Sequence, residues 1–176
     1  MKKIVLRYGA YAALFELIIF ILIWLVIWLL NPSHTIQAYV GWVNLLCPLL
    51  FIYFGIRYYR DRVNDGYITF IQGLKIGLLI VILPTVSFAL IETVYVLYID
   101  PKFYENVAIY DIEQYRKVLP PAEFAVKLKE IKQQIEAEKN PFYNFAGMIL
   151  TVGSLGIIVT VISAVLLKKK AKQVIV

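Results

Sequence analysis

Three charged side chains lie inside the long apolar stretches of this sequence, and they are its best candidates for chemistry. They are Glu16, Lys75 and Glu92. A charge placed in hydrocarbon is costly, so such a residue usually pairs, faces another helix or lines a polar cavity. The three residues therefore predict either structural ion pairs or an ion or proton site within a membrane.

Glu16 and Lys75 lie at similar predicted depths. Each follows the inner end of its apolar stretch by about two helical turns. We therefore expect an ion pair between the first and third helices, with Gln72 one turn from Lys75 and able to join it. Two interpretations stay open: a clamp that fixes helix pairing, and an ion or proton site. The clamp predicts that Glu16→Gln and Lys75→Gln each lower the yield of folded protein.

A second polar cluster is predicted near the outer surface. Glu92 lies roughly 25 Å beyond Lys75 along a continuous helix. Asn44 and Asn144 fall near the same surface, so we expect them to gather with Glu92. A small transporter or channel would use Glu16 and Lys75, or Glu92, at its substrate site. It predicts that Glu92→Gln folds normally but loses flux.

Catalytic and cofactor signatures are missing from the sequence. It contains one histidine, His34, and one cysteine, Cys47, which are too few for a metal cluster or a nucleophile–histidine pair. No phosphate-binding loop, zinc-protease motif or nucleophile elbow occurs. We therefore expect no cofactor, no metal and no enzymatic activity, and a scaffold or accessory subunit as the main functional hypothesis.

The elements that must position these residues are four apolar segments. The chain is 61% hydrophobic with a mean hydropathy of +0.73, and a helix needs roughly 20 apolar residues to cross a membrane. The sequence predicts an all-α four-helix bundle that forms one membrane domain over residues 1–176. The predicted spans are about 8–30, 39–58, 68–99 and 141–167.

Basic residues give these spans an orientation. Lys and Arg flank the N-terminus, the connection after the second span and the C-terminal tail, whereas the first connection, Asn31–Ala38, has neither. The positive-inside rule then places both termini in the cytoplasm and residues 100–140 outside. The net charge of +6 reflects this placement, and we expect contact with the lipid bilayer but not with nucleic acid. The tail lysines are Lys168, Lys169, Lys170 and Lys172.

The outer segment 100–140 has helical character of its own. Asp111–Val118 is long enough for two helical turns, and Pro121 is well placed to open a second helix that runs to Lys139. That second helix is amphipathic. Its apolar stripe predicts either contact with the membrane surface or the outer end of the bundle, or a partner-binding face. The stripe consists of Phe124, Leu128, Ile131 and Ile135.

Small residues predict close helix packing. Gly73 and Gly77 are four residues apart on the third helix, a spacing that lets another helix approach. We favour packing within one chain over dimerisation, although a membrane-protein partner or a homo-oligomer stays open. Gly147, Thr151 and Ser154 form a similar small face on the fourth helix.

The stretch from Gly66 to Gly77 reads GYITFIQGLKIG. It resembles the signature stretch of a bacterial membrane family catalogued as domain of unknown function 4199. The resemblance implies a four-span protein of the bacterial cytoplasmic (inner) membrane, but it implies no activity and no functional residues. Locally, Gly66 suits a turn, and Thr69 and Gln72 have the spacing of a helix capping box.

Overall fold

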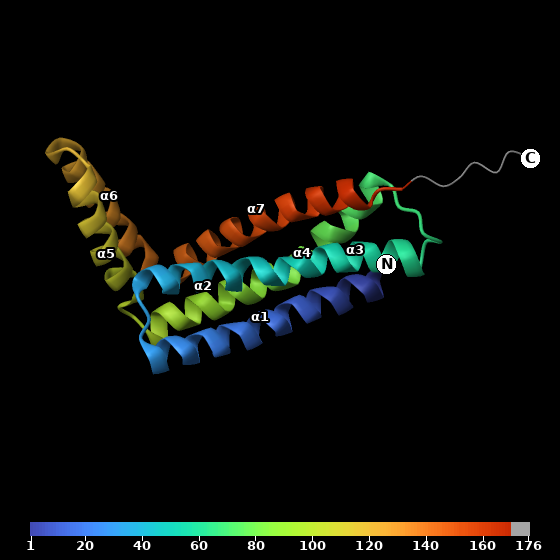
Figure 1. Ribbon diagram of the computed structural model, residues 1–176, viewed down its shortest axis with the longest axis horizontal. Coiled ribbons are helices and arrows are strands. Elements are labelled where there is room, and N and C mark those ends of the chain that lie inside the picture. Colours follow the sequence, from blue (N-terminus) through green and yellow to red (C-terminus); the bar gives the residue numbers. More distant parts are fainter. Residues whose placement is uncertain (170–176) are drawn as a thin grey trace, which may run out of the picture.

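Four long helices lie side by side and form the body of the protein (Figure 1). The computed structural model describes residues 1–169, so Lys170 and Lys172 of the basic tail lie outside the described residues. The all-α prediction is confirmed. The helices are α1 (Lys2–Leu30), α2 (His34–Leu46), the short 3₁₀ helix η1 (Cys47–Leu49), α3 (Leu50–Arg62), α4 (Phe70–Val94), the π-helical turn η2 (Tyr95–Ile99), α5 (Phe103–Val118), α6 (Pro121–Glu138) and α7 (Pro141–Leu167).

Four helical segments are long and apolar enough to cross a membrane. Their outer faces carry large, exposed apolar side chains, as lipid-facing helices do. On α1 these include Ile18, Ile21 and Leu29. The segments are Lys2–Leu30, Thr35–Arg62, Phe70–Ile99 and Pro141–Leu167.

The second span differs from its prediction, because its helix is interrupted. The 3₁₀ turn η1 lies between α2 and α3 and contains Pro48. Proline has no N–H, so the carbonyl of Asn44 lacks its α-helical donor and the chain tightens locally. The span also extends beyond the predicted 39–58 at both ends.

Helix α4 lies at the centre of the bundle and packs against α1, α3 and α7. It runs parallel to α1, since Gly9 lies against Ile80 and Phe20 against Tyr95. It runs antiparallel to α7. Gly73 lies against Ala164 of α7, whereas Gly77, further along α4, lies against Thr160, which comes earlier in α7.

The predicted glycine contact is formed within one chain. A Cβ at Gly73 would lie 3.1 Å from the Cβ of Ala164, and one at Gly77 would lie 2.9 Å from the hydroxyl of Thr160. On α7, however, the glycine that is buried against α4 is Gly156, which lies against Val81. The predicted face that begins at Gly147 points outward, because a Cβ there would meet nothing within 4 Å.

Helices α5 and α6 form a hairpin that projects from one end of the bundle (Figure 1). Helix α5 is longer than predicted, since it begins at Phe103 rather than Asp111. Pro121 opens α6, as predicted. The predicted apolar stripe of α6 is half-buried, and α6 packs against α5. Much of this stripe therefore holds the hairpin together.

Candidate functional site

The predicted ion pair between Glu16 and Lys75 is wrong. Glu16 is buried, with 1% of its surface exposed, and neither of its carboxyl oxygens has a hydrogen-bond partner within residues 1–169. Lys75 is exposed on α4, and none of the ion pairs in the described part of the chain includes it. Gln72 does not join such a network either, because its side chain caps α4.

The offset between α1 and α4 explains this error. Helix α1 begins at Lys2, six residues before the predicted boundary, so Glu16 is about four turns from its start rather than two. Gly9 already lies level with Ile80. Glu16 is therefore about 20 Å from Lys75 along the bundle axis.

We expect Glu16→Met to stabilise the protein, because it removes a buried carboxyl group that has no partner. Such a group costs about 1–3 kcal/mol in protein mutational data, so a gain of about 1 kcal/mol in the free energy of unfolding is expected. The matched change Lys75→Gln should alter it by less than about 0.5 kcal/mol. Unfolding in detergent micelles measures both, and equal losses from the two variants would restore the ion-pair clamp.

Two members of the second predicted polar cluster, Glu92 and Asn144, are joined through Tyr104 of α5. The Tyr104 hydroxyl donates to Glu92 Oε1 at 3.3 Å and accepts from Asn144 Nδ2 at 2.8 Å. Asn144 Oδ1 in turn accepts from the Thr93 hydroxyl at 2.8 Å. The chain of bonds thus links α4, α5 and α7 at the base of the hairpin.

Asn44 does not belong to this cluster. It is 6% exposed, and its Oδ1 has no hydrogen-bond partner among the described residues. Tyr104 and Thr93 were not predicted from the sequence. Tyr104 lies three residues after Pro101, in the first turn of α5. Its contact with the end of α4 can be inferred only when the start of α5 is known.

A second set of polar contacts lies at the same base. Lys139 Nζ lies 3.6 Å from Glu105 and 3.2 Å from Glu136. Burial raises the pKa of the Glu138 carboxyl, although the hydrogen bond from Gln134 opposes this. These contacts join the two ends of the hairpin to each other.

Burial also acts on the Tyr104 hydroxyl. It raises the pKa of Tyr104, and the nearby Glu92 carboxylate raises it further. The phenol therefore stays protonated at neutral pH and can keep donating to Glu92. Its role in the cluster is that of a hydrogen-bonding hub rather than an acid or base.

A cavity of about 190 Å³ opens beside this network. It combines an apolar wall with ionisable groups. Within residues 1–169, no three His, Cys, Asp or Glu side chains are grouped closely enough to hold a metal ion. The lining residues are Val96, Leu97, Pro101, Tyr104, Glu105, Ile135, Glu138 and Lys139.

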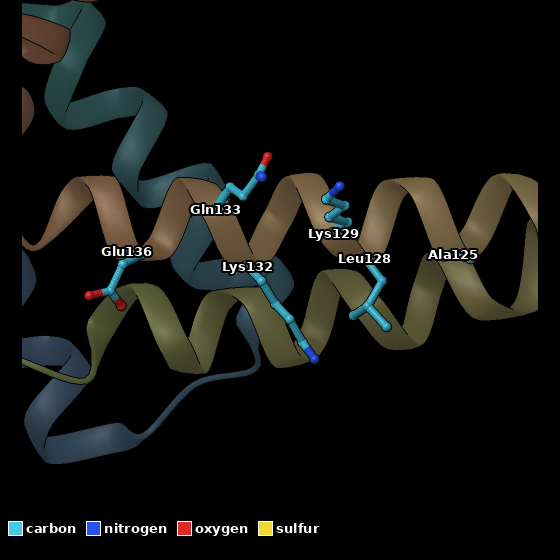
Figure 2. A pocket seen from close by; sticks show the side chains of 6 residues that line it. All are labelled: Ala125, Leu128, Lys129, Lys132, Gln133 and Glu136. Atoms are coloured by element: carbon cyan, nitrogen blue, oxygen red, sulfur yellow. The ribbon is translucent and has the colours of Figure 1, made fainter.

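A larger, open groove of about 550 Å³ lies along α6 (Figure 2). All of its lining side chains come from this one helix, and the helices of the bundle pass behind α6 in this view. The groove therefore faces away from the bundle. It is lined by Ala125, Leu128, Lys129, Lys132, Gln133 and Glu136.

The stretch from Gly66 to Gly77 has structural roles at the opposite end of the bundle. Gly66 has a φ of 81°, a conformation that suits glycine. Ile68 pairs through its backbone with Lys169, at 3.1 and 2.9 Å. Thr69 and Gln72 form the predicted capping box of α4. The stretch thus ends the loop between α3 and α4 and begins the central helix.

The comparisons agree with the architecture. Residues 7–169 match the family described as "Protein of unknown function (DUF4199)", which confirms the resemblance seen in the sequence. No curated protein and no solved structure shows significant similarity to the chain. With nearly its whole length matched and four helices able to span a membrane, the chain belongs to the DUF4199 family of proteins of unknown function.

Proposed function

We propose that this protein is a non-enzymatic scaffold or accessory subunit that presents its α5–α6 hairpin to another protein. The observation that carries this proposal is the α6 groove. It lies on a projecting element, faces away from the bundle, and is lined by side chains that are exposed apart from the half-buried Leu128 (Figure 2).

The charges of the groove favour one kind of partner. Lys129 and Lys132 have no ion pair within the described chain, whereas Lys127, on another face of α6, pairs with Glu130 at 3.0 Å. Leu128 lies beside these two lysines in the groove and offers an apolar contact (Figure 2). An acidic amphipathic helix of a second protein would match this pattern of charge and apolar surface.

The base of the hairpin is suited to such a role. Tyr104 and Asn144 tie α5 to the bundle, and Lys139 links α6 to Glu105 of α5. A hairpin anchored at its base loses little conformational freedom when a partner binds, which favours affinity.

The same proposal includes an orientation. We infer that both termini lie in the cytoplasm of a bacterium, in the cytoplasmic membrane, with the hairpin on the outer side. The support is the distribution of Lys and Arg at the ends of the spans. Cysteine labelling from outside should then modify Gln133→Cys in the hairpin and spare Asp65→Cys in the inner loop.

In-membrane photo-cross-linking tests the partner. A photoreactive residue at Gln133 in the groove should capture one other protein, while the same residue at Glu130, one helical turn away and outside the groove lining, should not. Loss of the exposed Lys127–Glu130 pair in the control is expected to cost less than about 1 kcal/mol. Lys129→Glu with Lys132→Glu should abolish the captured product.

Two outcomes would overturn the proposal. Capture of a second copy alone would show a homo-oligomer instead of an accessory subunit. Equal capture from Gln133 and Glu130 would show that the groove is not a specific surface.

A transporter is a second candidate, favoured by the connection of Glu92 through Tyr104 to the cavity. The apolar core below it, which includes Ile52, Ile76 and Ile80 at 0% exposure, gives this candidate less support. Glu92→Gln in proteoliposomes should abolish flux of the transported solute if this candidate is correct. Absence of flux above empty liposomes for the unmodified protein would exclude it.

A further inference from the structure

The cavity at the base of the hairpin is distinct from the α6 groove and has a different chemistry. One wall is apolar and consists of Val96, Leu97, Pro101 and Ile135. The π-helical turn η2 supplies part of this wall, and such turns are frequent at functional sites. The same lining carries the charged residues Glu105, Glu138 and Lys139.

The charges of the cavity lining do not balance. Lys139 is the cation of the lining, and it is already shared between Glu105 at 3.6 Å and Glu136 at 3.2 Å. Glu138 has a neutral partner, because the amide of Gln134 donates to it at 2.8 Å. Within residues 1–169, Glu138 is therefore a half-buried carboxylate without a cation, and Glu92 adds a second carboxyl group behind Tyr104.

The volume limits the size of a ligand. At about 190 Å³ the cavity exceeds the roughly 10–15 Å³ that one water molecule needs. It is smaller than the roughly 300–1,000 Å³ of sites for drug-sized molecules. A ligand with a few non-hydrogen atoms fits this range.

We propose that this cavity binds a small organic ammonium ion, with the charged nitrogen at Glu138 and a short apolar chain against Val96, Leu97 and Ile135. A bare metal ion does not match the apolar wall, and an anion would meet uncompensated carboxylates. The proposal does not depend on the partner proposed for the α6 groove, because the two sites share no lining residue.

Thermal unfolding of the full-length protein in lipid nanodiscs tests the site with three probes of the same length. Propylammonium should raise the midpoint temperature of unfolding in a saturable way, whereas propanol and propionate at the same concentration and ionic strength should not raise it. Glu138→Gln keeps the acceptor for Gln134 but removes the charge, and it should weaken propylammonium binding at least tenfold.

Glu130→Gln is the matched control, because it removes an exposed carboxylate from the same helix outside the cavity. It should leave propylammonium binding unchanged. The proposal is overturned if propylammonium gives no saturable shift, if propionate stabilises the protein as well, or if Glu138→Gln binds as tightly as the unmodified protein. Should Glu138→Gln fail to fold, Ile135→Trp, at a half-buried position of the lining, fills the cavity and must abolish the shift.

Discussion

Gly156→Val is expected to prevent folded protein from accumulating. Helix α7 touches α4 at this position, where an added Cβ would collide with the side chain of Val81 and lie 3.7 Å from Leu49. Valine adds two further carbons at this contact. Overpacking of this kind costs about 1–3 kcal/mol and in some cases more, a large part of the total stability of a protein. Size-exclusion chromatography of the solubilised protein measures the folded fraction.

Gly147→Val is the matched control on the same helix. Nothing lies within 4 Å of a Cβ at Gly147, so the folded yield should stay near that of the unmodified protein. A milder pair identifies the cause: Gly156→Ala should destabilise the bundle, and Val81→Ala should restore much of the loss by making room. Equal tolerance of valine at both glycines would contradict the packing of α7 on α4.

Tyr104→Phe is expected to loosen the base of the hairpin. The change removes one hydroxyl and leaves both the Asn144 amide and the Glu92 carboxyl without that partner. Each unsatisfied buried group costs about 1–3 kcal/mol. Hydrogen exchange of the backbone amides at the start of α5 should therefore become at least roughly tenfold faster, as a change of about 1.4 kcal/mol implies.

Tyr98→Phe provides the comparison, because Tyr98 lies nearby in η2 and is 79% exposed. In the Tyr98→Phe variant, the backbone amides at the start of α5 should exchange at the same rate as in the unmodified protein. If Tyr104→Phe leaves α5 equally protected, the hydrogen bonds of Tyr104 do not anchor the hairpin and apolar packing alone must do so.

Local features of the bundle could be predicted from the sequence. The capping box of Thr69 and Gln72 depends on residues three apart, and the opening of α6 at Pro121 depends on proline itself. The packing of Gly73 and Gly77 follows from a four-residue spacing on one helix. The overall count of spans follows from segment length and hydropathy.

Errors arose where two helices had to be aligned. A pair between Glu16 and Lys75 requires α1 and α4 to begin at the same depth. Side-chain packing at Gly9 and Phe20 instead shifts the two helices along the bundle axis. Whether Gly147 or Gly156 is buried also depends on the rotation of α7 against α4. Neither property is contained in the periodicity of one helix.

The sequence by itself therefore determined the membrane class, the four spans, the helix caps and the amphipathic helix α6, because hydropathy, proline and short-range hydrogen bonds act within a few residues. Only the tertiary structure decided that Glu16 has no hydrogen-bond partner within residues 1–169, that Tyr104 rather than Asn44 joins Glu92 to Asn144, and that a cavity opens beside them. Those features depend on the axial offset and rotation of helices that are distant in sequence, which the packing of many side chains sets together.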